Sequence, residues 1–165
     1  MPGPRLGTRV RPRVDWNNFD PDVLRWRLEA GVDERIVPDL VELRTVIKPA
    51  AARIAAIAAT AEDVAACETA CAAMEHATDG GGSYLQADLD FHHRLLLATH
   101  NRFVVGMAPV FSAMLEVSFR LSAASLAGAK AALPMHRRVL DEIIARDDLA
   151  GALRGRHPRR AALPA

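Results

Sequence analysis

Apolar residues recur three or four positions apart along most of this chain, which is the spacing of one face of an α-helix. The longest such stretch runs from about residue 37 to residue 59, where Pro49 predicts a kink or a split. Other helices are predicted from Pro21 to Gly31, over 61–77, from Ser83 to about His100, from about Arg102 to Ser125 with a kink at Pro109, from Pro134 to about Arg146, and from Asp147 to about His157. Residues 126–133 are predicted to be a connection of small residues. The pattern predicts an all-α fold, an antiparallel bundle of six or seven helices.

Capping signals support three of these helix starts. Asp20 precedes Pro21, which places an N-cap carboxylate before a proline at the first helical position. Thr60 with Asp63, and Ser83 with Gln86, have the spacing of a capping box. These signals make the helix starts the best-defined boundaries in the sequence.

The chain divides into four segments. Residues 1–14 combine Pro, Gly and Arg with an alternating pattern that predicts a short exposed strand, without a core of its own. Residues 15–36 are predicted to be a linker with a short helix, residues 37–157 the helical bundle, and residues 158–165 a basic tail.

Composition and charge agree with one folded domain. The chain has 165 residues, of which 50% are hydrophobic, 25% charged and only 5% aromatic, which argues against disorder and against a β-sandwich. Residues 1–14 and 151–165 each carry four Arg and no acid, so the rest of the chain has a net charge of −7. Such basic ends either contact phosphate or are solvated tails, whereas an acidic middle does not wrap nucleic acid.

No membrane segment is predicted. The longest uncharged apolar run has thirteen residues, from Phe103 to Leu115, which is too short to span a bilayer. No apolar stretch follows the first arginines, so a secretory signal is not expected. We therefore expect a cytoplasmic location. Cys67 and Cys71 lie one helical turn apart with Met74 and are predicted to be core residues.

The segment from Ser83 to His100 contains the candidate chemistry. If its leucines define the buried face, Asp88 and His92 share that face, one turn apart, whereas Asp90, His93 and Arg94 are solvated. A carboxylate on an apolar face is costly unless it is paired or binds a cation. Either His92 or a metal ion meets that need for Asp88.

Two later histidines also lie on apolar faces. His136 aligns with Val139 and Leu140, and His157 aligns with Leu153. Taken alone, each is more often a hydrogen-bonded core histidine than a ligand. Together with Asp88 and His92, they form a candidate site for zinc or nickel with room for an anionic ligand. No metalloprotease pair, nucleophile elbow or phosphate-binding loop accompanies them, so an enzyme is not expected.

The chain resembles the effector-binding FCD domain of GntR-type transcriptional regulators, in the FadR-like branch. The resemblance covers nearly the whole chain. It rests on Asp39-Leu-Val-Glu-Leu-Arg44 with Pro49-Ala-Ala, Asp88-x-x-Phe91-His92, Ala98-Thr99-x-Asn101, and His136 followed by Val139-Leu140 and Ala145-Arg146-Asp147. It implies a homodimer and a metal held at the positions of Asp88, His92, His136 and His157.

The resemblance extends into the N-terminal segment. Residues 7–13 look like the last strand of the family's winged helix-turn-helix domain, and residues 16–24 look like the linker of members that respond to sugar acids. The recognition helix would then lie before Met1, as after a misplaced start site or a truncation. Operator DNA would be bound through that missing domain, with Arg9, Arg11 and Arg13 adding weak phosphate contacts.

The function that follows is sensing of a small carboxylate or sugar acid that modulates operator binding. Arg44 and Arg120 are the candidate cations for the acid, because a guanidinium matches a carboxylate, and Asn101 is a candidate neutral partner. A solvated or helix-capping role for both arginines stays open. Two alternatives remain: a metal-dependent helical-bundle enzyme, and a dimerisation module with a vestigial site.

Overall fold

The computed structural model describes residues 9–30, 36–121 and 126–154, and within these ranges it contains helices and no strand. A short 3₁₀-helix, Arg13–Asp15, precedes the α-helices. These are α1 (Pro21–Glu29), α2 (Ile36–Ala58), α3 (Ala61–Thr78), α4 (Tyr84–Leu97), α5 (Arg102–Gly106), α6 (Ala108–Leu121) and α7 (Leu126–Arg154). The prediction of an all-α bundle is confirmed.

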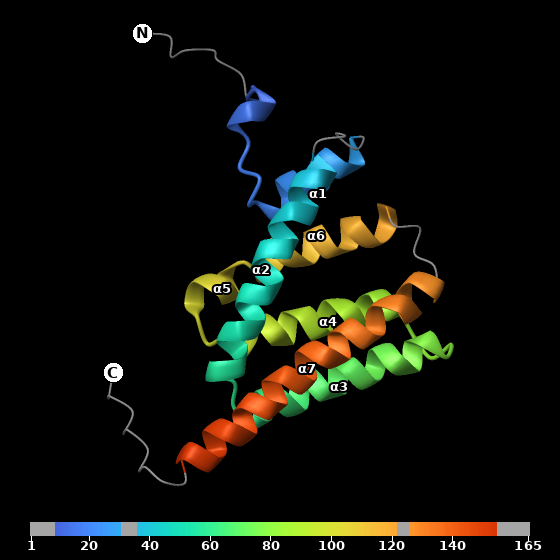
Figure 1. The fold of residues 1–165 in the computed structure, drawn as a ribbon. Helices are drawn as coiled ribbons and strands as arrows, with labels where there is room; N and C mark the ends of the chain where they lie inside the picture. The colour runs from blue at the N-terminus through green and yellow to red at the C-terminus, as the bar shows by residue number, and fades with distance from the viewer. Residues whose placement is uncertain (1–8, 31–35, 122–125, 155–165) are drawn as a thin grey trace.

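Helices α3, α4 and α7 pack together, α1 packs against α6, and both α2 and α4 contact α6. Helices α3, α4 and α7 lie side by side, with α3 running opposite to α4 and α7, and α2 crosses them towards α1 and α6 (Figure 1). The core follows these contacts and contains residues that are almost inaccessible to solvent. The largest of them are Phe91, Leu24, Met74, Met114, Leu140, Ile143, Cys67 and Cys71. The core position predicted for the two cysteines is therefore confirmed, and both are free thiols.

Helix α2 continues through Pro49, so the predicted split does not occur. Proline removes one backbone hydrogen bond from a helix, which favours a break when nothing opposes it. Here Leu40 lies before the proline and Ala51 and Ala55 after it, and all three are buried. Packing on both sides of Pro49 outweighs the lost hydrogen bond.

The prediction of a connection followed by two short helices in the C-terminal region was wrong. Helix α7 is one helix of 29 residues, and Pro134 and Asp147 lie inside it instead of starting two shorter helices. Residues 126–133 include four alanines, which favour helix formation, and Ala129 is buried. The predicted end near His157 lies outside the described residues.

The predicted helix from Arg102 to Ser125 is broken at Met107, two residues before Pro109. Pro109 then falls in the first turn of α6, where a missing N–H costs no helical hydrogen bond. The prediction of one kinked helix was therefore wrong, because the structure has two separate helices, α5 and α6, in this region.

The predicted N-terminal strand is absent from the described part of that segment. Residues 9–12 have no regular structure, and Arg13 begins the 3₁₀-helix; residues 1–8 lie outside the described ranges. A single strand has no partner for its backbone groups, and among the described residues none is supplied. The indole N–H of Trp16 instead donates to the carbonyl of Arg11 at 2.8 Å.

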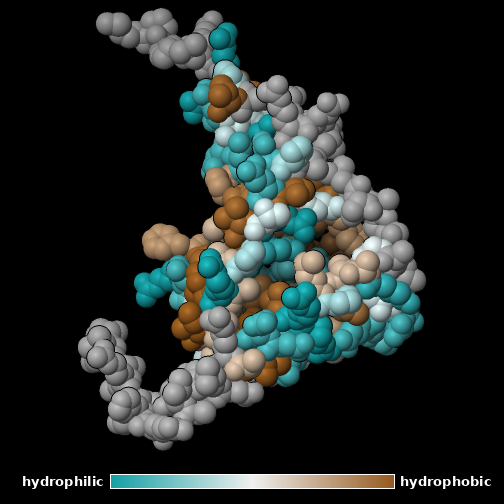
Figure 2. Space-filling view, in the orientation of Figure 1, coloured by the Kyte–Doolittle hydropathy of each residue, from teal (hydrophilic) through white to brown (hydrophobic). Residues whose placement is uncertain are grey.

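No helix among the described residues is long and apolar enough to span a membrane. Hydrophilic side chains cover much of the face drawn in Figure 2, between smaller groups of hydrophobic ones.

The three predicted caps are present. Oδ1 of Asp20 accepts from two backbone N–H groups at the start of α1, and Oγ of Ser83 accepts from the N–H of Gln86 at the start of α4. At the start of α3, Thr60 and Asp63 form a complete capping box. His100 contacts the same carboxylate, with 2.7 Å between its Nε2 and Oδ2 of Asp63. One cap therefore links the α2–α3 turn to the end of α4.

Thr60→Ala is expected to lower the free energy of unfolding by about 1 kcal/mol, because it removes the side-chain cap of α3. Urea unfolding measures the change. Thr69→Ala is the matched control, since Thr69 is exposed and its hydroxyl only donates to Ala65 within the same helix. Equal effects of the two substitutions would contradict the assigned role of the cap.

Candidate metal and effector site

Helices α4 and α7 bring three metal-binding side chains together: Asp88, His92 and His136. Asp88 and His92 are one turn apart on α4, so both project from the same face, and His136 meets them from α7. Oδ1 of Asp88 lies 3.0 Å from Nε2 of His136 and 3.7 Å from Nε2 of His92. The two Nε2 atoms are 3.2 Å apart.

Ligand atoms about 2.0–2.1 Å from a divalent ion lie roughly 2.9–3.4 Å from one another, in octahedral or tetrahedral geometry. The distances of 3.0 and 3.2 Å fall in this range, and the distance of 3.7 Å between Asp88 and His92 is slightly longer. Two imidazole nitrogens and a carboxylate oxygen also form a donor set suited to a transition-metal ion, and such a triad leaves further positions open. The residues therefore fit a divalent metal without rearrangement of the helices.

The hydrogen bond of His136 also favours a cation. Its Nδ1 lies 3.0 Å from the carbonyl oxygen of Ala132, which only accepts, so Nδ1 carries the proton. The Nε2 of a neutral His136 then presents a lone pair to the carboxylate of Asp88, and two acceptors face each other. A proton or a metal ion between them removes this repulsion.

Burial lowers the pKa of His92 well below its ordinary value, and the nearby positive charge of Lys48 acts in the same direction, although Asp88 opposes it. The imidazole is therefore neutral at neutral pH, as a metal ligand must be. For Asp88, burial acts to raise the pKa, but a hydrogen bond donated by the doubly protonated form of His136 and the positive groups nearby outweigh it. The net pKa of Asp88 is lowered, so its carboxylate stays ionised.

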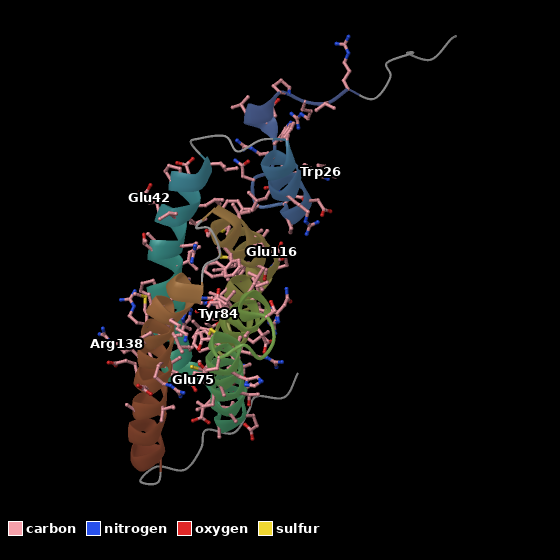
Figure 3. All side chains as sticks on the ribbon, turned by 90° about the vertical axis from the view of Figure 1, so that its right-hand side faces the viewer. Trp26, Glu42, Glu75, Tyr84, Glu116 and Arg138 are labelled. Carbon is pink, nitrogen blue, oxygen red and sulfur yellow. The ribbon has the colours of Figure 1, made fainter. Side chains whose placement is uncertain are left out.

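The triad opens onto a cavity of about 990 Å³ between α2, α4, α6 and α7. In the described part of the chain, three buried side-chain atoms lack a hydrogen-bond partner: Nε of Arg44, the hydroxyl of Tyr84 and Nδ1 of His92. All three residues line this one cavity. Tyr84 lies among the side chains between the helices, whereas Arg138, at the rim, extends outward from α7 (Figure 3).

The structure places the predicted site residues as follows. Asp88, His92 and His136 come together, and Arg44 lines the same cavity. His157 and the side chain of Arg120 lie outside the described residues.

Asn101 is a correction, because it is exposed and does not line the cavity. Its Oδ1 accepts from the N–H groups of Phe103 and Val104 and caps α5. The polar side chain that suggested an effector contact is engaged in local structure.

Asp90, His93 and Arg94 are exposed to solvent, as predicted. Asp90 pairs with Arg94 at 3.1 Å on the exposed face of α4, and His93 is also exposed. Arg9 and Arg11 are exposed, and the side chain of Arg13 is not described.

Lys48 and Tyr84 line the cavity but were not among the predicted site residues. Lys48 follows Arg44 by four residues, so the helical period places both on one face of α2, and this signal was present in the sequence. Tyr84 begins α4, one turn before Asp88, and its pKa is raised by burial to about 12.

A family model described as the FCD domain matches residues 39–158. The chain is 34% identical over 113 residues to the galactonate operon transcriptional repressor of Escherichia coli K12, a match that covers 68% of this chain and 49% of that protein. It is 28% identical over 149 residues to the HTH-type transcriptional regulator YieP of the same organism, which covers 89% of this chain and 64% of that protein. The chain thus spans about half of one of these transcriptional regulators and under two thirds of the other.

The metal-free protein is expected to lose stability as the pH falls below about 6.5. The pKa of His92 is lower in the folded protein than in the unfolded chain, so the unfolded chain takes up a proton first. The contribution is complete above pH 6.5, and below it the free energy of unfolding falls with a limiting slope of about 1.4 kcal/mol per pH unit. Asp88 adds a loss of the same sign only below about pH 4, because its pKa is also lowered.

Urea unfolding with a chelator present, at several pH values, measures this slope. His92→Gln removes the titrating ring. It is expected to make the free energy of unfolding nearly independent of pH between neutral pH and the pH range in which carboxylates titrate. A wild-type curve that is already flat there would show that His92 is protonated in the folded state.

Proposed function

The chain belongs to the FCD-domain family of GntR-type regulators, and from this premise we propose that it senses a small acid in a metal-containing cavity. The family and the relatives support an effector-binding regulatory domain. The metal, the acid and their effect on operator binding are the parts that we propose.

One observation carries the proposal. The three described residues with a buried, unpartnered polar atom all line the same cavity as the metal-binding triad. Unpaired polar atoms in a folded interior are costly, and a core of ordinary packing avoids them. A polar ligand with its own donors and acceptors satisfies such atoms when it binds. The wall is therefore suited to a polar occupant.

Asp88, His92 and His136 hold the divalent ion in this proposal, and His157 remains the expected fourth ligand. Imidazole nitrogens with one carboxylate suit ions of intermediate softness, so zinc and nickel are the candidates. A bound ion supplies a Lewis-acidic position for an oxygen of the effector. Ala132 orients His136 through the hydrogen bond at Nδ1, which makes this carbonyl a supporting group.

The effector is proposed to be a small carboxylate or a sugar acid. Arg44 is the closest match to a carboxylate, because it is half-buried, faces the cavity and has an unpartnered Nε. One relative is named for a galactonate operon, and galactonate is a sugar acid. Arg120 stays a candidate for a second contact.

The response is proposed to pass through the arrangement of the helices. The cavity is lined by residues of α2, α4, α6 and α7, so a ligand that contacts several of them favours one arrangement over others. In a cytoplasmic homodimer, that shift would change the spacing of two DNA-binding domains located outside these residues. Arg9, Arg11 and Arg13 would add only salt-sensitive phosphate contacts.

The two alternatives are weighed by the same findings. Neither the matched family nor the two relatives is an enzyme, which argues against the metal-dependent enzyme. A dimerisation module with a vestigial site would bind neither metal nor acid. The following experiments therefore distinguish the proposed sensor from such a module.

Purified protein is expected to bind about one zinc or nickel ion per chain, and Asp88→Asn to weaken binding at least about 100-fold, since it removes a ligand. Isothermal titration calorimetry of the stripped protein measures both. Asp90→Asn is the matched control on the same helix, because Asp90 is exposed and pairs with Arg94. Indistinguishable titrations of the two variants would rule out Asp88 as a ligand.

An acid that binds the cavity is expected to raise the melting temperature, with about 2.7 kcal/mol of stabilisation at 100 times its dissociation constant. Thermal melts against a panel of sugar acids and small carboxylates identify it. Arg44→Met should abolish the shift, while Arg25→Met, which removes an exposed partner of Asp22, should keep it.

The complete regulator then provides the functional test. Its affinity for operator DNA is measured with and without the identified acid at one fixed salt concentration. Equal affinities would reject the sensing function even if the acid binds.

A further inference from the structure

Two cations form part of the inner wall of the cavity. Arg44 and Lys48 are one turn apart on α2, both are half-buried, and both line the cavity. The other bases of the lining, Arg53 and Arg138, are exposed at its rim together with Glu142. The inner wall therefore differs in charge from the rim.

The only inner carboxylate among the described residues that line the cavity is Asp88, and its Oδ1 already contacts both histidines. No ion pair of the described residues includes Arg44 or Lys48. Charges removed from water are costly when no opposite charge lies beside them. The inner wall thus has two partly buried cations and only one carboxylate, which already contacts two histidines. A bound metal ion would add further positive charge.

The pKa of Lys48 reflects the same excess of positive charge. This pKa is lowered to about 8, mainly by burial and also by the charge of Arg44, and Asp88 only partly opposes these effects. Burial also lowers the pKa of Arg44. An anion placed between the two side chains would relieve both.

We propose that Lys48 binds a second acidic group of the effector, so that this cavity selects dianions over monoanions. The inference rests on the proposed sensing function and specifies its ligand class. Arg44 and Lys48 project from one helical face a turn apart, so they are placed to receive two acidic groups joined by a short carbon chain. Both a dicarboxylic acid and a phosphorylated sugar acid have this chemistry.

The test compares acids that differ only in the second charge. Galactonate and galactarate share a carbon skeleton and differ at one end, where galactarate carries a second carboxylate. Butyrate and succinate make the same comparison without hydroxyl groups, and 6-phosphogluconate carries a phosphate as its second anionic group. Binding of each acid to the metal-loaded protein is measured by calorimetry for the wild type, Lys48→Met, Lys48→Arg and Lys130→Met. Lys130 is exposed on α7 and is the matched control.

The wild type is expected to bind at least one dianion roughly ten-fold or more tightly than its monoanionic counterpart. Lys48→Met should remove that preference and leave monoanion binding within about two-fold, whereas Lys48→Arg and Lys130→Met should keep it. Preference for galactarate identifies a dicarboxylate, and preference for 6-phosphogluconate identifies a phosphorylated acid.

Three results would overturn the inference. If galactonate and butyrate both bind as tightly as their dianionic partners, Lys48 does not select charge, although the sensing function stands. If Lys48→Met weakens monoanions and dianions equally, Lys48 contributes only general positive charge. If none of the five acids binds while the metal does, the inference and the proposed acid class fail together.

Discussion

The carboxylate of Asp88 is the constraint on which the rest of the site depends. It lies on the packed face of α4, where an ionised group is stable only beside positive charge or hydrogen-bond donors. His92 from the same helix and His136 from α7 both contact it, so one side chain joins two helices. Because Phe91 is buried beside them and packs edge-on against both imidazoles, the positions of these rings are fixed by the core.

Much of this arrangement could be predicted from the sequence because it depends on local periodicity. The spacing of four residues places Asp88 and His92 on one face of any helix, and His136 lies on the apolar face of its own helix. The caps at Asp20, Thr60 and Ser83 were equally predictable, since a cap requires only neighbouring residues. These features do not depend on how the helices pack.

Features that depend on packing were predicted less well. Pro49 and Pro134 lie inside helices, because buried contacts on both sides compensate for a local defect that the sequence alone overestimates. The spacing of Lys48 from Arg44 was visible in the sequence, but its place in the same cavity as Asp88 depends on how α2 packs across α4 and α7. Asn101 shows the opposite error, since a polar residue near the end of a helix was assigned to ligand binding and instead caps α5.

The position of Pro49 has a mechanical consequence. A proline inside a helix leaves the carbonyl four residues earlier, that of Thr45, without its usual helical donor, so bending costs less there than elsewhere in α2. Arg44 and Lys48 lie on the N-terminal side of this weak point, and Ala51 and Ala55 are packed into the core on the other side. A bend at this point would therefore change the position of the two cations relative to the buried half of α2.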